Sequence, residues 1–146
     1  MSHVAHIADF IVVPSSGTTD TDRGFDLCVG AHQTLRFSLP EGLVSDERAV
    51  LAFMVNPNAD VKDITFEILI NEHSVRAATI SGGPSRTFIE VVGGNVLSVG
   101  ANDIEFKVTR GTGIDDSSWA SFSNPIAAFS DIVLWFQRKV AAAHES

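Results

Sequence analysis

Strict alternation between apolar and polar residues is the feature that most constrains the fold of this chain. From Asp103 to Val108 every second residue is charged, and the residues between them are apolar. Successive side chains of a β-strand point to opposite faces of its sheet, so this segment predicts a strand with one buried and one solvated face. Residues 64–70 have the same periodicity, with one apolar face made by Ile64, Phe66, Ile68 and Ile70.

Seven further segments are typical of strands, and turns rich in Gly, Pro, Asn and Ser separate them. They are residues 5–13, 25–29, 35–39, 49–56, 74–80, 86–92 and 129–138. Eight or nine short strands predict an all-β fold, an antiparallel two-sheet β-sandwich of jelly-roll type. We expect a single domain over residues 1–140 and a frayed tail over residues 141–146.

The first and last strands are the most apolar parts of the chain. Residues 132–136 are apolar on both faces. In the first strand one face has Ala8, Phe10 and Val12, and the other has Ile7, Ile11 and Val13. Two interpretations stay open: the two strands are central and pair with each other, or another subunit covers part of their surface.

The order of the strands predicts where the connections lie. If consecutive strands run antiparallel, one end of the sandwich gathers residues 30–33, 56–62, 81–85 and 111–127. The other end gathers residues 14–24, 40–47, 71–73 and 93–102. Binding residues often lie in such clustered loops, because a rigid scaffold can present variable segments.

The charge of the chain narrows the classes of partner. Ten Lys and Arg residues against eighteen Asp and Glu residues give a net charge of −8 over 146 residues. An acidic domain repels phosphate backbones and anionic lipids, so we expect neither nucleic acid nor a membrane as a partner. The sequence shows no signal peptide and no apolar run long enough to span a membrane, which predicts a soluble protein, cytoplasmic by default.

Catalytic patterns are missing from the sequence. It has no Gly-x-Ser-x-Gly elbow, and its one cysteine, Cys28, lies in an apolar run where a buried, inert thiol is expected. The five histidines are scattered and have no zinc-type spacing. We therefore expect that the protein is not an enzyme.

Three segments resemble a known fold family. Residues 66–71 are a strand that ends in Asn71, residues 88–91 are a following strand, and residues 97–106 have the pattern Leu-x-x-Gly-x-Asn-x-Ile-x-Phe. Together they resemble the galactose-binding-domain-like jelly rolls that occur as accessory carbohydrate-binding modules of glycoside hydrolases, although Glu72 replaces the commoner Gly at the hairpin. The resemblance implies a jelly-roll module that binds sugars, lipids or proteins, or supports a neighbouring domain.

The longest loop, residues 111–127, contains residue types that bind sugars. An indole ring can cover the apolar C–H groups of a sugar, while carboxylates and amides bind its hydroxyls. We predict a ligand site made by Trp119, Asp115, Asp116 and Asn124, with Asn58 from a connection at the same end. The alternative is that Trp119 and Phe122 pack back onto the core.

A second loop is acidic and has the oxygen ligands that calcium prefers, from Asp20, Asp22 and Asp26. Arg23 lies between these carboxylates, and the later bidentate Glu of an EF-hand is missing. The alternative is a solvated turn before a strand. We therefore expect no required cofactor, and the three aspartates are the candidate ligands of a structural calcium.

Two functions remain compatible with the sequence. The first is a non-catalytic ligand-binding module, with carbohydrate as the expected ligand, bound by loops at one end of the sandwich. The alternative is a structural or assembly protein that forms a homo-oligomer through apolar sandwich surfaces. The expected partners are accordingly a carbohydrate or protein and further copies of this chain.

Replacing Trp119 separates the two interpretations of the long loop. If the indole is a sugar platform, Trp119→Ala should abolish glycan binding and leave the melting temperature nearly unchanged. If the indole caps the core, the variant should instead lose thermal stability, which would contradict its place in the ligand site. Calorimetric titration and thermal unfolding of the same preparation measure both effects.

Overall fold

Nine strands are present in the computed structural model, which describes residues 4–14, 24–113 and 125–141. They are β1 (Val4–Val12), β2 (Gly24–Leu27), β3 (His32–Leu39), β4 (Ala49–Pro57), β5 (Val61–Ile70), β6 (His73–Ser81), β7 (Arg86–Val92), β8 (Gly100–Gly113) and β9 (Ala127–Ala141). Within these described ranges no helix is long and apolar enough to cross a membrane. The strands form two antiparallel sheets, which confirms the predicted all-β sandwich.

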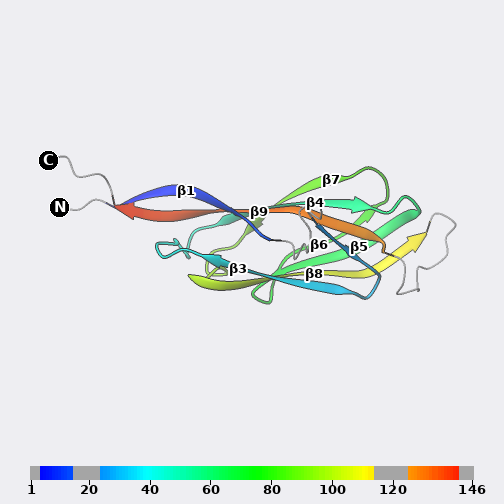
Figure 1. Ribbon diagram of the computed structural model, residues 1–146, viewed down its shortest axis with the longest axis horizontal. Helices are drawn as coiled ribbons and strands as arrows, with labels where there is room; N and C mark the ends of the chain where they lie inside the picture. The colour runs from blue at the N-terminus through cyan, green and yellow to red at the C-terminus, as the bar shows by residue number, and fades with distance from the viewer. Residues whose placement is uncertain (1–3, 15–23, 114–124, 142–146) are drawn as a thin grey trace.

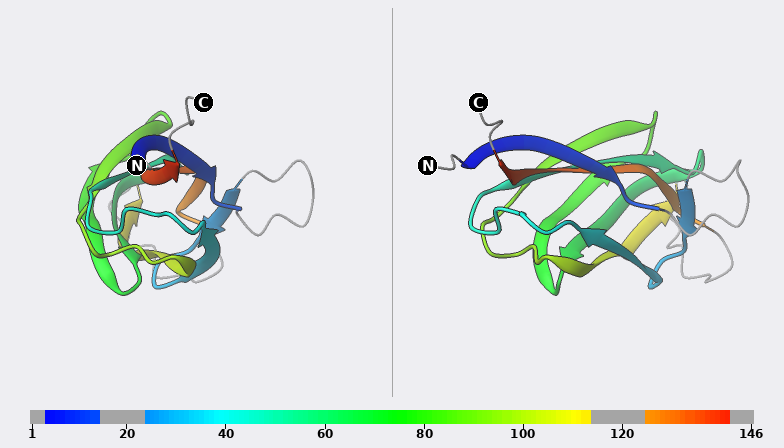
Figure 2. Two further views of the ribbon diagram at one scale, coloured as in Figure 1. Left: turned by 90° about the vertical axis from the view of Figure 1, so that its left-hand side faces the viewer. Right: turned by 60° about the vertical axis from the view of Figure 1, so that its left-hand side comes forward.

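The two sheets stack face to face (Figure 1). Sheet A has the strand order β1-β9-β4-β7, with β2 also paired to β9, and sheet B has the order β3-β8-β5-β6. From β6 onward, successive strands alternate between sheet B and sheet A, so the chain crosses repeatedly between the layers. The two further views in Figure 2 show both sheets wrapping around a shared interior.

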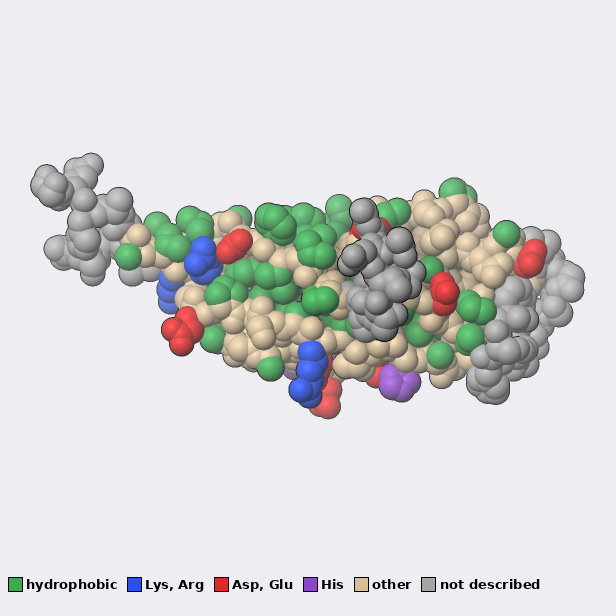
Figure 3. All heavy atoms as spheres, in the orientation of Figure 1, with side chains coloured by type: hydrophobic (Ala, Val, Ile, Leu, Met, Phe, Trp, Pro, Cys, Tyr) green, Lys and Arg blue, Asp and Glu red, His purple; other side chains and the backbone are tan. Residues whose placement is uncertain are grey.

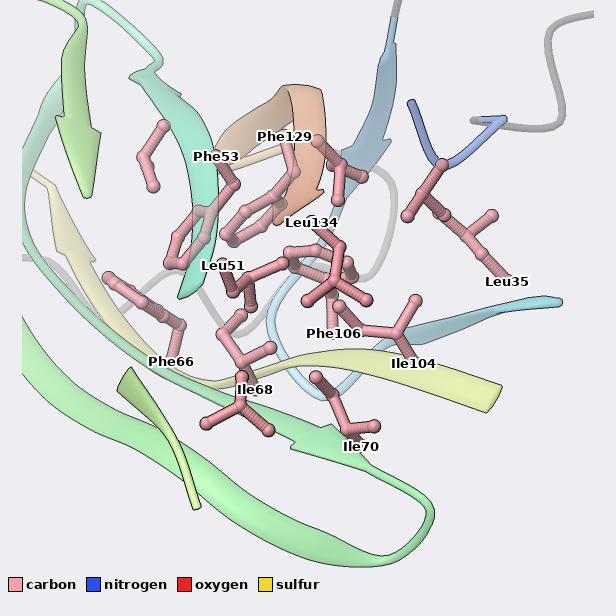
Figure 4. Packing of buried hydrophobic residues seen from close by; sticks show 14 of the residues in the cluster. Leu35, Leu51, Phe53, Phe66, Ile68, Ile70, Ile104, Phe106, Phe129 and Leu134 are labelled. Atoms are coloured by element: carbon pink, nitrogen blue, oxygen red, sulfur yellow. The ribbon is translucent and has the colours of Figure 1, made fainter. Parts of the chain in front are cut away.

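Phenylalanine rings fill the space between the sheets. Phe53 and Phe129 of sheet A meet Phe66 and Phe106 of sheet B, and all four are fully buried (Figure 4). The ring centroids of Phe106 and Phe129 lie 5.1 Å apart, and those of Phe53 and Phe66 lie 6.1 Å apart with the rings edge to face. The predicted inward faces of β5 and β8 are confirmed, since these side chains are at most 1% exposed: Ile64, Phe66, Ile68, Ile70, Ile104, Phe106 and Val108.

A β-bulge in β9 decides which of its residues face this core. The register against β4 shifts here, and Asp131 has a positive φ of 51°. Phe129 is buried before the bulge and Ile132 and Leu134 are buried after it, so the alternation changes phase by one residue. The strand lies between β1 and β4, so the first of the two open interpretations is confirmed in part: the terminal strands pair with each other and β9 is central, but β1 lies at the edge of the sheet.

The edge of sheet A beside β9 consists of two half-strands in line with each other. β1 pairs with residues 133–141 of β9, and β2 pairs with residues 127–130. Both are antiparallel to β9, so they run in the same direction. The assumption that consecutive strands are antiparallel therefore fails for β1 and β2, which end and begin along the edge opposite Val133 and Ser130, and residues 15–23 of the expected connection lie outside the described residues.

A pair of asparagines ties together the turns at one end of the sandwich. Asn102 is 2% exposed, and its Oδ1 accepts hydrogen bonds from the Ser98 backbone N (2.9 Å) and from Asn71 Nδ2 (2.8 Å). Its Nδ2 donates to the carbonyl oxygens of Ser98 (2.8 Å) and Gly100 (3.0 Å). Gly100 has a φ of +87°. The Leu-x-x-Gly-x-Asn pattern thus forms a turn in which Gly100 has a positive φ and Asn102 hydrogen-bonds its own loop.

Replacing Asn102 should strongly destabilise the fold, because its amide satisfies buried polar groups on two loops. Each such group left unpaired costs about 1–3 kcal/mol, so Asn102→Ala should lower the free energy of unfolding by about 3 kcal/mol in urea denaturation. Asn56→Ala, at an exposed strand position, is the matched control and should lose less than about 1 kcal/mol. Equal losses for the two variants would contradict the structural role of Asn102.

Candidate functional site

One end of the sandwich gathers the connections that the strand order predicted there, and we call it the loop end. The register places Gly113 opposite Val61 and Ala127 opposite Pro57, so β8 ends and β9 begins beside the β4–β5 turn. The connection between β2 and β3 lies there too, since Gly30 N donates to the Val108 carbonyl oxygen (2.8 Å). Apart from residues 14–24, the predicted division of the connections between two ends is confirmed.

A hollow of about 170 Å³ opens at the loop end of sheet A. Its lining residues come from β2, β4, the β4–β5 turn and the start of β9: Asp26, Asn56, Pro57, Asn58, Pro125, Ala127 and Ala128. The sequence placed Asp26 in a metal site and Asn58 in a ligand site. The structure brings these two residues together in one hollow.

Three residues that pair with one another across neighbouring strands of sheet A form the floor and two walls of the hollow. Asp26 on β2 pairs with Ala128 on β9, and Ala128 pairs with Asn56 on β4. Residues paired in this way share a face of the sheet. The methyl side chain of Ala128 therefore lies between a carboxylate and an amide and leaves space between them.

The two walls differ in how their polar atoms are satisfied. Asn56 Oδ1 accepts a hydrogen bond from Ser85 Oγ at 2.8 Å. The Asp26 carboxylate is exposed and has no hydrogen bond or ion pair within the described part of the chain. A carboxylate accepts hydrogen bonds at both oxygens, whereas an amide can both donate and accept. The side chains of Asp26 and Asn56 together therefore suit a ligand with several hydroxyl groups.

Asn58 holds the rim of the hollow in place. Its Nδ2 donates to the Pro125 carbonyl oxygen at 3.1 Å, and its Oδ1 accepts from Asp60 N at 3.2 Å. The Asn58 backbone N also donates to the Ile126 carbonyl oxygen at 2.9 Å. These bonds attach the start of β9 to the β4–β5 turn, so Asn58 positions the rim, and its amide keeps one further donor and acceptor toward the hollow.

The remaining predicted site residues lie outside the described residues. They are Asp20, Asp22, Asp115, Asp116, Trp119 and Asn124. Within the described ranges, no three His, Cys, Asp or Glu side chains come close enough to hold a metal ion. Sequence reasoning missed Asn56 and Ser85, although Asn56 is the one polar residue of the expected strand 49–56 and stands at its end, which was a usable signal.

The sequence matches no protein-family model and no curated protein. Several solved structures are similar to this chain. BuGH86wt, solved in complex with neoagarooctaose, has a TM-score of 0.58 at 13% identity, and the match covers 97% of this chain and 20% of that one. A β-porphyranase of glycoside hydrolase family 86 from the human gut bacterium Bacteroides plebeius has a TM-score of 0.57 at 14% identity, over 95% of this chain and 22% of that one.

A family 35 carbohydrate binding module from an environmental isolate has a TM-score of 0.49 at 15% identity, over 92% of this chain and 88% of that module. The chain spans about a fifth of the length of BuGH86wt and of the β-porphyranase. Identities this low show the fold alone. The predicted resemblance to jelly-roll modules of glycoside hydrolases is confirmed at that level.

Proposed function

We propose that this chain is a non-catalytic module that binds carbohydrate in the hollow at the loop end. The observation that carries the proposal is the row Asp26–Ala128–Asn56, which presents a carboxylate and an amide on either side of a small apolar floor. Sugars offer neighbouring hydroxyls that both donate and accept, together with apolar C–H groups. A rigid sheet that presents a few convergent polar groups is suited to bind them.

The similar folds support this proposal. One is part of a protein solved with neoagarooctaose, and another is part of a β-porphyranase. A fold alone does not determine a function, so the support comes from the fold together with the polar hollow. Asn124 precedes Pro125 of the rim in the chain, and we propose that Trp119, Asp115, Asp116 and Asn124 complete the site.

The proposal is for a non-catalytic module because the carboxylates assigned to the site do not match those of a glycosidase. Hydrolysis of a glycosidic bond needs two carboxyl groups on opposite sides of the bond. Among the described residues that line the hollow, Asp26 is the one with an ionisable side chain. Asp115 and Asp116, which we propose complete the site, are adjacent in one loop and do not by themselves supply two carboxyl groups on opposite sides of a bond.

Asp26→Ala should weaken carbohydrate binding by about tenfold or more, because a hydrogen bond to a charged group contributes about 1.5–3 kcal/mol. Asn56→Ala should weaken it by about two- to tenfold, because a hydrogen bond to a neutral amide contributes about 0.5–1.5 kcal/mol. Calorimetric titration with neoagarooctaose and with other neutral oligosaccharides measures the effect. Asp46→Ala is the matched control, since Asp46 is exposed in the connection between β3 and β4, away from the loop end. Binding that is absent in the unchanged protein, or equally strong in all variants, would rule out the hollow as a sugar site.

Assembly is a second candidate function, and a separate observation favours it. Five large apolar side chains on the outer side of sheet A are exposed: Phe10 (57%), Val12 (62%), Ile89 (70%), Val91 (60%) and Trp135 (41%). Figure 3 shows hydrophobic side chains gathered along the side of the molecule that β1 and β9 form. Exposed apolar surface of this extent is typical of a protein–protein contact.

A further inference from the structure

The five exposed large apolar residues on the outer side of sheet A belong to two continuous rows that cross four strands. In the first row Phe10 pairs with Trp135, Trp135 with Val50, and Val50 with Val91. In the second row, in the same strand order, the paired residues are Val12, Val133, Ala52 and Ile89. We call these eight residues the apolar face.

The apolar face contrasts with the outer face of sheet B. None of its eight residues is charged or polar, whereas the outer face of sheet B has an ion pair between Arg36 and Asp103 (3.2 Å) and a polar contact between His32 Nδ1 and Glu105 Oε2 (3.1 Å). An antiparallel sheet that faces water on one side normally has polar residues there. Sheet B follows this rule and the central part of sheet A departs from it, so a partner is expected on sheet A.

The extent of the apolar face fits the core of a dimer interface. With about 150–250 Å² for a whole aromatic side chain and less for Val and Ile, the exposed fractions amount to on the order of 500 Å² per subunit. A stable interface buries roughly 800 Å² per partner, with an apolar core inside a polar rim. The apolar face therefore supplies the core, and the polar residues around it can supply the rim.

The two rows of the apolar face differ in side-chain size in a way that lets two copies of the face fit together. The first row is bulky because it has Phe10 and Trp135, and the second is low at its centre because it has Ala52 and Val133. A two-fold axis that lies in the interface, parallel to the rows and between them, places Trp135 of one copy over Val133 of the other and Val50 over Ala52. The same contacts are then repeated in reverse, as a symmetric interface requires.

We propose that the apolar face is the interface of a homodimer with this two-fold packing. The proposal rests on the second candidate function, assembly, and names its partner and geometry. Both copies have a net charge of −8, but the apolar face has no charge, so their repulsion acts at long range. Salt screens such repulsion, and the dimer should therefore become tighter between about 0.05 and 0.5 M salt.

Sedimentation equilibrium tests the proposal. At micromolar concentration the chain should have twice its mass of 15.6 kDa, and Ile89→Lys should be a monomer, because the charge would be buried against the partner. Val99→Lys is the matched control: Val99 is 50% exposed but lies before β8, outside the apolar face, so this variant should stay dimeric. A monomeric unchanged protein, a dimeric Ile89→Lys variant, or association that weakens with salt would each overturn the proposal.

A second variant tests the packing itself. Ala52→Phe makes the apolar face more hydrophobic but fills the low row, so the predicted two-fold packing should be lost and the mass should fall to that of a monomer. Growth into larger aggregates would show nonspecific stickiness and contradict the packing, as would an unchanged dimer. Thermal unfolding of each variant establishes that it is folded, and Val12→Lys replaces any variant that is not.

The same samples separate this proposal from carbohydrate binding. Ile89 lies two rows away from Asn56 along sheet A, outside the hollow. Monomeric Ile89→Lys should therefore keep the oligosaccharide affinity of the unchanged protein. Loss of sugar binding in this variant would overturn the hollow as the sugar site and place the ligand on the apolar face, whereas the masses of the unchanged protein and the variant decide the dimer.

Discussion

Strand β9 pairs with other strands on both sides: with β2 over residues 127–130 and β1 over residues 133–141 on one side, and with β4 over residues 127–135 on the other. Its bulge at Asp131 lets Phe129 and Leu134 both reach the core, although they are five residues apart. The same change of phase turns Ala128 outward at the loop end and Trp135 outward further along. The hollow and the apolar face therefore depend on one irregularity in one strand.

The bulge also divides the outer face of sheet A chemically. On the loop-end side the outward residues are polar or small, as in the row of Asp26, Ala128 and Asn56. In the two rows that follow the bulge, through Val133 and Trp135, the outward residues are apolar across all four strands. We interpret this division as two surfaces with separate tasks, one that binds a small polar ligand and one that meets another copy of the chain.

Local patterns predicted much of the fold. The alternation in residues 64–70 and 103–108 identified the buried faces of β5 and β8, because a strand with one wet face has period 2 whatever it pairs with. The Asn102 turn was predictable for a similar reason, since its hydrogen bonds are mostly to residues nearby in the chain. The assumption that consecutive strands run antiparallel failed only for β1 and β2, which share one edge of sheet A.

The surfaces were harder to predict, because they depend on register between distant strands. Phe10 and Val91 share a row only through β9 and β4, and no local signal contains that information. The bulge was hidden as well: residues 132–136 are apolar throughout, so their sequence does not show which of them faces outward. For the same reason Asp26 and Asn58 were predicted for different sites and share one hollow.

The separation of the two surfaces can be measured directly by nuclear magnetic resonance of the ¹⁵N-labelled protein during a titration with neoagarooctaose. The chain has two tryptophans, Trp119 and Trp135, and hence two indole N–H signals. If the hollow and the apolar face are separate surfaces, the backbone signals of Asp26, Asn56 and Ala128 should move on titration while the indole signal of Trp135 stays in place. Movement of the Trp135 indole with unchanged signals from the hollow would contradict it.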